Sequence, residues 1–248
     1  MENLLDSKNK GSLKFLLTYP LFDQDIFESR KKELLSLGIN GIFSSGNLQL
    51  NEIFILGKGS VGLVTIARYK RKYFALKIRR TDANRPNMFD EVIYQALANS
   101  HGVGPFLVNF SENFILMEFV RGSNIIDWYS SSRISRKRML KCTALILQQC
   151  YLLDCLNLDH GQLNRLNCHI IISKDDKPTI LDFETSSTQR RVSNITSASQ
   201  SIFLSGPIYS RIRNSIHYDK GQIMKKIKSY KTQMDQERFN DILSMLGL

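Results

Sequence analysis

The chain has 248 residues, of which 42% are hydrophobic and 23% charged, and this ordinary globular composition excludes a disordered or collagen-like protein. No apolar run approaches the roughly 20 residues that cross a bilayer, and charged residues interrupt the N-terminal stretch, so we expect no membrane contact, no signal peptide and a cytoplasmic location. The formal net charge of +11 favours anionic partners such as nucleotides, RNA or ribosomal particles, although solubility alone also explains it.

The four cysteines show no C-x-x-C spacing, and three of them lie in one apolar stretch. A buried thiol behaves as a small hydrophobic group. The pattern therefore favours core cysteines over a zinc site or disulfides.

The first 47 residues, 1–47, are expected to form an N-terminal extension with a single helix. Residues 23–37 have a helical pattern, and Gly38 stands where a helix commonly ends. Residues 48–79 are rich in extended, apolar segments, interrupted by the glycines of GKGSVG at 57–62. This pattern predicts two or three antiparallel strands.

A second helix is predicted within residues 81–100, because apolar residues recur there at helical spacing. Asp82 or Asn84 is the candidate N-cap, and Pro86 suits the first turn of such a helix. Two short strands are expected next, on either side of a turn at 111–113.

Beyond Gly122 the chain changes from strand-rich to helix-rich. A long helical segment is predicted over 124–158, with a core-facing stripe formed by Met139, Leu140, Thr143, Ile146, Leu147, Cys150 and Leu153. Two short apolar strands follow within 169–184, and the basic C-terminal part has a helical pattern whose apolar side is expected to pack on the same lobe.

This order predicts an α+β fold with two lobes and a cleft where they meet. The β-rich N-terminal lobe is expected over residues 48–121, and the helical C-terminal lobe over 122–248.

The glycine-rich stretch is compatible with two readings, a hairpin turn or a loop that covers the phosphates of a nucleotide. Lys77 lies farther along in an apolar strand, where its ammonium group is a natural partner for phosphate. Glu91, on the next predicted helix, could hold this lysine in place, or the two could form an ordinary surface pair.

The second half carries its own candidate residues. Asp182 ends an apolar strand, where a carboxylate needs a partner such as a Mg²⁺ ion bound to phosphates. Upstream, residues 159–169 gather an unusual density of polar groups between two apolar segments.

Taken in order, these motifs resemble those of the protein-kinase-like superfamily over roughly residues 48–190. The matching motifs are Gly57-x-Gly59-x-x-Gly62-x-Val64, FALK with Lys77, the helical Glu91, MEFVRG at 117–122, HGQL at 160–163 and LDFE at 181–184.

The resemblance implies an ATP- and Mg²⁺-dependent phosphotransferase with a two-lobed protein-kinase-like fold. It implies that Lys77 binds the α- and β-phosphates, Glu91 positions Lys77, and Asp182 binds Mg²⁺. The remaining implied ATP contacts are Gly57, Gly59, Ser60, Gly62 and Val64 over the phosphates, and the backbone at Glu118 to Val120 around adenine.

The chain departs from the usual kinase pattern where the catalytic base should be. HGQL places Gln162 at the position of the catalytic aspartate and Asn167 at that of the second metal ligand, and Asp159 could replace the base. A second alignment, counted back from Asp182, places Asn164 at the base and His169 at the metal. Few residues follow LDFE, so we expect a reduced C-terminal lobe.

DHGQL at 159–163, DFE at 182–184, RR at 190–191 and SNITS at 193–197 are similar to motifs of small atypical kinases of archaea. These include the RIO and Bud-type proteins and a group of predicted archaeal serine/threonine kinases. The resemblance implies transfer of phosphate to protein serine or threonine, weak or directed at the chain itself, or ATP hydrolysis. A missing base lowers a rate by about 10²–10⁴-fold rather than abolishing transfer.

Residues 185–201 are predicted to be an activation segment and an autophosphorylation target, with Arg190 and Arg191 contacting phosphate, or else a solvated polar loop. Two other functions stay open. One is an ATP-binding pseudokinase that acts as a nucleic-acid- or ribosome-associated factor, which the basic C-terminal residues favour. The other is a small-molecule kinase, which the short C-terminal region disfavours.

Overall fold

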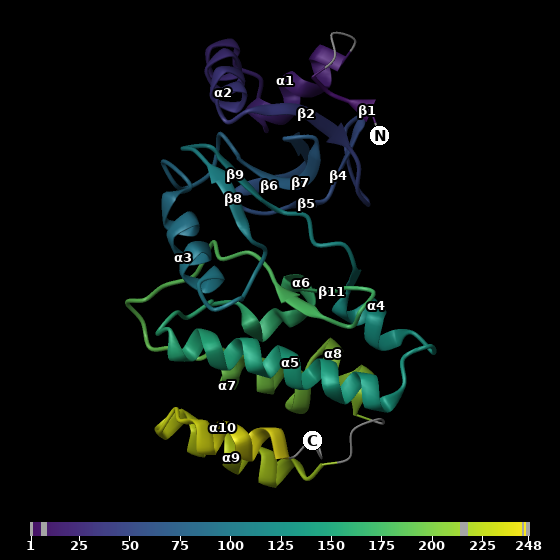
Figure 1. Cartoon of the computed structure of the whole chain (residues 1–248), viewed down its shortest axis with the longest axis vertical. Coiled ribbons are helices and arrows are strands. Elements are labelled where there is room, and N and C mark those ends of the chain that lie inside the picture. Colours follow the sequence, from purple (N-terminus) through teal and green to yellow (C-terminus); the bar gives the residue numbers. More distant parts are fainter. Residues whose placement is uncertain (1, 6–8, 214–217, 245, 247–248) are drawn as a thin grey trace. The chain divides into compact units, whose positions relative to one another are not determined.

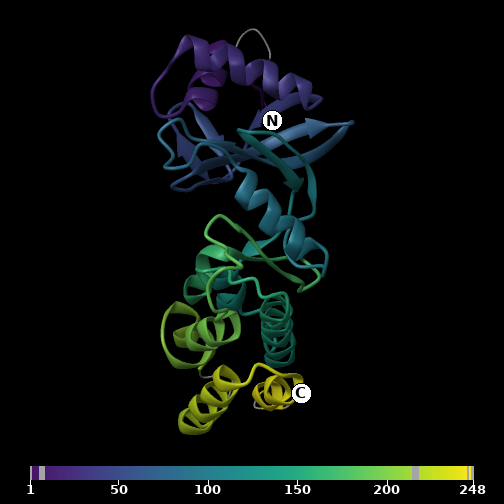
Figure 2. The same cartoon turned by 90° about the vertical axis from the view of Figure 1, so that its left-hand side faces the viewer.

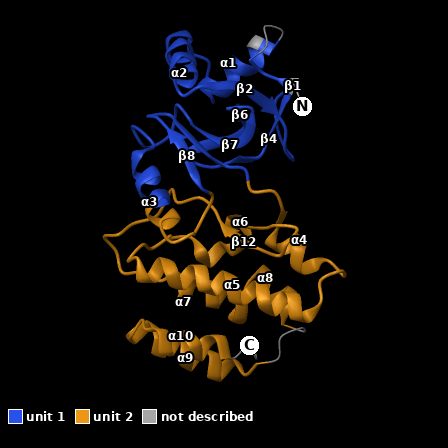
Figure 3. Cartoon of the chain, viewed as in Figure 1, with its two compact units in different colours: residues 1–96, 106–119 blue, residues 97–105, 120–248 orange. Residues whose placement is uncertain are grey.

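The computed structural model describes residues 2–5, 9–213, 218–244 and 246, which form a mixed α+β protein with an antiparallel sheet. The chain divides into two compact units (Figure 3), residues 1–96 with 106–119 and residues 97–105 with 120–248. The second unit therefore includes 97–105, which the sequence had assigned to the first lobe. Among the described helices, none is both long and apolar enough to cross a membrane.

Unit 1 is built on an antiparallel sheet that includes residues from the predicted extension. In spatial order its strands are β1 (Glu2–Asn3), β2 (Ile39–Ser44), β6 (Gly62–Tyr69), β7 (Lys72–Arg79), β9 (Phe114–Glu118) and β8 (Leu107–Phe110), with β5 (Gly57–Lys58) also paired to β6. A separate hairpin joins β3 (Leu48–Leu50) to β4 (Ile53–Ile55). Because β2 pairs with β6, residues 1–47 are part of this unit and not an appended segment.

Two helices, not one, lie between β1 and β2 in the chain: α1 (Lys10–Thr18) and α2 (Gln24–Ser36). Asp23 caps α2 by accepting a hydrogen bond from the Ile26 N–H, and Gly38 follows its end with a φ of +77°. Both helices cover one face of the sheet, and α3 (Phe89–Asn99) lies on the other face (Figures 1 and 2).

The predicted start of α3 was wrong. The side chain of Asn87 accepts a hydrogen bond from the Phe89 N–H, so neither Asp82 nor Asn84 caps the helix, and Pro86 lies before it. The turn expected at 111–113 does join β8 to β9.

Side chains alternate across β7, and this alternation positions the candidate lysine. Leu76 and Ile78 belong to the core beneath α1 and α2. Lys77, between them, therefore faces the α3 side of the sheet, where Val92 and Ile115 form a second, smaller apolar cluster.

Unit 2 is mostly helical, around the long helix α5 (Arg136–Cys155). Its other helices are α4 (Ile125–Ser130), α6 (Leu166–His169), α7 (Asn194–Ser199), α8 (Pro207–Ile212), α9 (Lys220–Thr232) and α10 (Gln236–Ser244), and a π-helical turn spans Gln200–Leu204. Its small sheet has the order β10 (Ser123–Asn124), β11 (Ile170–Ile172) and β12 (Pro178–Ile180).

The core of unit 2 follows the predicted helical stripe. The buried residues on α5 are Met139, Cys142, Thr143, Ile146, Leu147, Cys150, Leu153 and Asp154. Cys142 and Cys150 are buried free thiols, as predicted for the apolar stretch that contains them. Cys155, in the same stretch, is an exposed free thiol, so the prediction was wrong for it, and Cys168 is also exposed. On α9, Ile223 and Tyr230 are buried within the same unit, as the apolar side of that helix predicted.

Candidate functional site

The glycine-rich stretch forms a tight turn between β5 and β6. The Gly59 N–H donates to the Gly62 carbonyl at 2.8 Å, and Gly57 pairs with Val64 across the two strands. Neither Gly57 nor Gly62 has a left-handed φ, so the hairpin backbone does not itself require glycine at these two positions.

Space, rather than backbone conformation, explains one of the glycines. A Cβ at Gly62 would lie 3.0 Å from the Lys77 Cε and Cγ atoms and 3.1 Å from the Ile78 carbonyl oxygen. A Cβ at Gly57 would meet nothing within 4 Å. Gly62 thus allows the turn to lie directly against the Lys77 side chain, whereas no protein contact accounts for Gly57.

Lys77 and Glu91 form the ion pair that the sequence suggested. The Lys77 Nζ lies 2.7 Å from one Glu91 carboxylate oxygen and 2.9 Å from the other. The two side chains are only 5% and 2% exposed. A desolvated pair of this kind contributes little net stability, because losing water is costly for both charges. This burial excludes the alternative of an ordinary surface pair.

The other predicted nucleotide contacts of unit 1 lie around this pair or at the end of the sheet. Ser60 is exposed at the tip of the glycine turn, and Val64 is opposite Lys77 in the β6–β7 register. The Glu118 N–H donates to the Phe106 carbonyl oxygen at 2.8 Å, so this amide is already committed to a protein partner. Val120, half-buried, belongs to unit 2.

In unit 2, Asp182 follows β12 in an uncommon backbone conformation. Its φ is +68°, a left-handed value that costs free energy for any residue with a Cβ and that often marks a functional position. The carboxylate is 36% exposed, and one of its oxygens lies 3.9 Å from the His169 Nδ1. Of the two metal-ligand alternatives, His169 is therefore the one placed beside Asp182.

Glu184 is a site residue that the sequence reasoning missed. One of its carboxylate oxygens lies within 4.8 Å of one from Asp182, and its side chain is buried. Two carboxylates this close favour a bound cation, and oxygen ligands are those that Mg²⁺ prefers. The DFE motif could have indicated Glu184 as a site residue, because this acidic residue replaces the glycine of the usual kinase motif.

His160 is a structural residue within this region. Its Nε2–H donates to the Leu181 carbonyl oxygen at 2.9 Å, and the ring packs against those of His169 and Phe183. The pKa of His160 is lowered to about 4, mainly by burial, against the opposing hydrogen bond to the Leu181 carbonyl; His169 contributes to the lowering and two carboxylates oppose it. The imidazole is therefore neutral near pH 7.

The candidate replacements for the catalytic base lie in an irregular segment. Gln162 precedes a 3₁₀ turn, Leu163–Arg165, and its carbonyl accepts the Arg165 N–H. Asn164 is exposed. Asn167 lies on α6, where its amide donates to the Cys168 sulfur at 3.3 Å. The Asn167 carbonyl oxygen also accepts a hydrogen bond from the side-chain amide of Asn124, the residue that caps α4.

Asp159 is held in a structural network, which argues against its predicted role as a base. One carboxylate oxygen accepts from the Ser193 N–H at 2.9 Å and the Ser193 hydroxyl at 3.0 Å. The other accepts from the Arg190 Nε at 2.5 Å. Since Asp159 is 4% exposed, these donors take both oxygens and leave no open face for a substrate hydroxyl.

The same network corrects the interpretation of residues 185–201. Arg190 contacts Asp159 and the Thr185 carbonyl, Arg191 donates to the Lys231 carbonyl, and α7 occupies Asn194–Ser199. None of the serines and threonines of this segment is exposed. It is therefore a packed part of unit 2 instead of a solvated loop, and the two arginines already have protein partners.

A buried carboxylate at the centre of this packing was not foreseen. Asp154, on α5, accepts hydrogen bonds from the N–H and side-chain amide of Asn194, from the Ile195 N–H and from the Tyr230 hydroxyl, at 2.8–3.2 Å. Burial raises the pKa of Asp154, and these donors lower it. The residue thus joins α5, α7 and α9, which are far apart in the sequence.

Comparison with known proteins provides no assignment. The chain matches no protein-family model, and no curated protein shows significant sequence similarity to it. The function proposed below therefore rests on the geometry within each unit.

Proposed function

We propose that the chain binds ATP with Mg²⁺ and transfers phosphate to serine or threonine hydroxyls of proteins, as an atypical member of the protein-kinase-like superfamily. Unit 1 would serve as the N-terminal lobe and unit 2 as a reduced C-terminal lobe. The observation that carries the proposal is the glycine turn packed on the buried Lys77–Glu91 pair. A structural lysine has little reason to be desolvated beneath a turn, whereas a phosphate-binding lysine must be held there.

Each role that ATP and Mg²⁺ binding requires has a residue with suitable chemistry in this chain. Lys77 would neutralise phosphate charge, and Glu91 would fix the ammonium group in place. Asp182 would bind Mg²⁺, with Glu184 and His169 beside it. Gly57, which no protein contact explains, would allow the backbone to approach the nucleotide.

The transfer would form a bond between the acceptor oxygen and the γ-phosphorus while the bond to the β-phosphate oxygen breaks. Phosphoryl transfer depends mainly on positioning and charge neutralisation, so the hydroxyl proton can leave to the transferred phosphate or to water. Because Asp159 is engaged, we expect a slow enzyme.

The test has two parts. Binding of ATP, with and without Mg²⁺, is measured by isothermal titration calorimetry, and phosphate transfer from labelled ATP to protein is measured separately. Lys77→Met and Asp182→Asn should each weaken Mg²⁺-ATP binding at least tenfold and abolish transfer. Lys72→Met on the same strand and Asp175→Asn are matched controls, because both residues are exposed and the charge changes are identical. Equal affinities for wild type, Lys77→Met and Asp182→Asn would exclude this site.

The engagement of Asp159 also supports a second candidate, an ATP-binding pseudokinase that acts on RNA or ribosomal particles. Exposed lysines on α9, namely Lys225, Lys228 and Lys231, provide a basic surface for phosphates. This function predicts normal ATP binding without transfer, and RNA binding that weakens steeply with salt. Replacing the three lysines with glutamine would then reduce RNA binding and leave ATP binding unchanged.

A further inference from the structure

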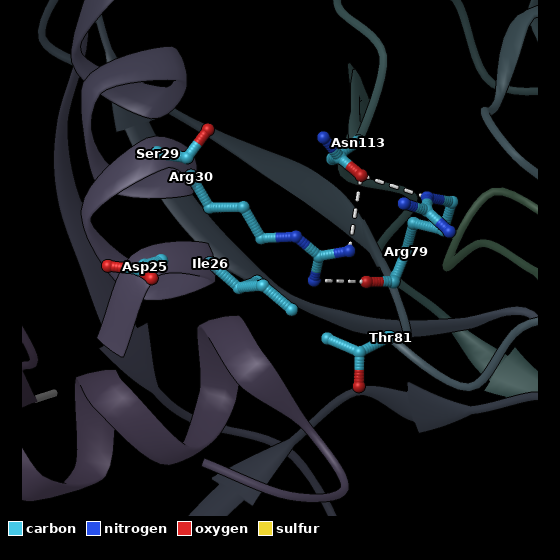
Figure 4. A pocket seen from close by; sticks show the side chains of 7 residues that line it. All are labelled: Asp25, Ile26, Ser29, Arg30, Arg79, Thr81 and Asn113. Carbon is cyan, nitrogen blue, oxygen red and sulfur yellow. Dashed lines mark hydrogen bonds between the residues drawn. The ribbon is translucent and has the colours of Figure 1, made fainter. Parts of the chain in front are cut away.

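A pocket in unit 1 lies apart from the glycine turn and from the Lys77–Glu91 pair. It has a volume of about 330 Å³, within the range of small-molecule sites. Figure 4 shows its lining side chains, which come from α2, from the end of β7 and from the turn before β9: Asp25, Ile26, Ser29, Arg30, Arg79, Thr81 and Asn113. Most of them are polar, which is unusual for a void left by imperfect apolar packing.

Arg30 is the central residue of this pocket, and it is 3% exposed. Its Nη1 donates to the carbonyl oxygens of Leu17 and Arg79 at 2.7 and 2.6 Å, and its Nη2 donates to the Asn113 side-chain oxygen at 3.1 Å. Among the described residues, no carboxylate oxygen lies within 4.0 Å of the guanidinium. Buried charges are normally paired, so a buried arginine held only by neutral acceptors is exceptional.

A second guanidinium lies beside the first. The Arg79 Nε donates to the same Asn113 oxygen at 2.8 Å, and its Nη1 donates to the Arg85 carbonyl at 2.9 Å. The pKa of Arg30 is lowered to about 10, mainly by burial and also by the Arg79 charge, and Glu33 and Glu112 oppose this shift. The two arginines thus concentrate positive charge at a buried position.

The nearby acidic residues offset this charge incompletely. Glu33 accepts hydrogen bonds from the N–H and side-chain amide of Asn113 at 2.8 and 2.7 Å, so its oxygens are engaged away from the arginines. Asp25 lies at the exposed rim, where solvent screens its charge. The Ser29 side chain also lines the pocket, whereas the Thr81 hydroxyl already donates to the carbonyl oxygens of Thr18 and Tyr19, at 3.3 and 3.1 Å.

We propose that this pocket binds an oxyanion group of a small molecule, a phosphate or a carboxylate, through Arg30 and Arg79. The described hydrogen bonds use three donor contacts of Arg30 and two of Arg79. A guanidinium has five N–H groups, which leaves donors for an anion. This inference does not rest on the proposed transfer activity.

Binding of an anion in the pocket would also affect the glycine turn at 57–62. Arg79 and Thr81 flank Arg80, whose Nη1 donates to the Gly59 carbonyl at 3.0 Å. The Arg80 N–H donates to the Val61 carbonyl at 2.8 Å. An anion that shifts Arg79 or Thr81 would therefore change the environment of the turn at 57–62.

The test is an NMR titration of the ¹⁵N-labelled full chain with inorganic phosphate, and separately with acetate, at constant ionic strength. The Nε–H signals of Arg30 and Arg79 should shift saturably with at least one anion, and the Gly59 amide should shift with the same dissociation constant. The anion that binds more tightly identifies the preferred group. A lack of saturable shifts with both anions would overturn the proposal.

Variants separate this site from the proposed nucleotide site. Ser29→Trp fills the pocket from an exposed helical position and should weaken anion binding at least tenfold without removing either guanidinium. Ser36→Trp, exposed on the same helix, is the matched control and should bind as wild type. The double variant Lys77→Met/Glu91→Leu, which replaces both buried charges of the proposed nucleotide site with apolar groups, should leave the Arg30 shift intact. Loss of that shift in the double variant, or its persistence in Ser29→Trp, would place the anion elsewhere and refute the assignment.

Discussion

Buried charges in the two units are held in different ways. In unit 1, Lys77 and Glu91 form a buried ion pair on one face of a sheet, directly under a turn in which a Cβ at Gly62 would crowd the Lys77 side chain at 3.0 Å. In unit 2, Asp154 and Asp159 each accept several hydrogen bonds, mainly from the segment that contains α7. The pair in unit 1 therefore lies next to the glycine turn at 57–62, whereas the carboxylates in unit 2 hold helices together.

This difference shows that polar residues within motifs that resemble those of kinases can have different roles, some at a candidate binding site and others in holding the fold. The DHG and SNITS motifs resemble catalytic segments, yet the Asp159 carboxylate of the first accepts hydrogen bonds from Ser193 of the second and from Arg190, and these bonds hold the fold of unit 2. Gly161 illustrates this, because a Cβ there would lie 2.3 Å from an Arg190 nitrogen and its φ is +86°. Four substitutions test the contrast, in order of decreasing expected effect.

Asp154→Ala should destabilise unit 2 by about 4 kcal/mol or more, because it leaves four buried donors without an acceptor. Trp128, the chain's single tryptophan, lies in unit 2 and reports its unfolding in urea by fluorescence. Asp241→Ala, at an exposed position, is the control and should change the free energy of unfolding by less than about 0.5 kcal/mol. A similar small change for both variants would contradict the structural role of Asp154.

Lys77→Met should destabilise unit 1 by about 3–5 kcal/mol, because the buried Glu91 carboxylate then loses the charge of the Lys77 ammonium group. The double variant Lys77→Met/Glu91→Leu should recover most of this loss, since two apolar groups then replace two desolvated charges. Hydrogen exchange of the β6 and β7 amides measures the effect within unit 1. If the double variant is as unstable as the single one, the ion pair itself stabilises the fold, and this result would contradict its interpretation as a ligand-binding pair.

The buried neutral His160 should make stability depend on pH. Its folded pKa of about 4 lies below the unfolded value of 6.5, so the stabilisation is complete above pH 6.5 and is lost as the pH falls toward 4. The loss can reach about 3 kcal/mol, at about 1.4 kcal/mol for each pKa unit.

This pH dependence is measured from Trp128-detected urea unfolding between pH 4 and 7. His160→Gln should flatten the curve, because glutamine can still donate to the Leu181 carbonyl and does not titrate. His101→Gln, at an exposed histidine, should leave it unchanged. An equally steep curve in His160→Gln would show that other groups cause the acid sensitivity.

Asp159→Asn should have the smallest effect, about 1 kcal/mol on the stability of unit 2. Asparagine keeps an acceptor oxygen, and solvent screens the lost charge because the Arg190 side chain is 46% exposed. Phosphate transfer should stay within about threefold of wild type, since a base contributes about 10²–10⁴-fold. A hundredfold loss of transfer with unchanged unfolding would restore Asp159 as the base.

Local patterns predicted much of this molecule. Apolar periodicity placed the buried stripe of α5, and a glycine at 38 indicated the end of α2. Strand propensity indicated β6 to β9 and the turn between the last two. The cap of α3 was misplaced because Asp82, Asn84 and Asn87 are all suitable capping residues, and the sequence offers no means of choosing among them.

The sequence by itself determined most helices and strands beyond residue 47 and which residue types are available for phosphate and metal chemistry, and it suggested Glu91 as the partner of Lys77. Only the tertiary structure decided that the Lys77–Glu91 pair is buried, that Asp159 is engaged by Ser193 and Arg190, and that Arg30 is buried beside Arg79. Charge pairing and burial depend on groups brought together from distant parts of the chain, and the long-range packing that unites them leaves no local pattern to read.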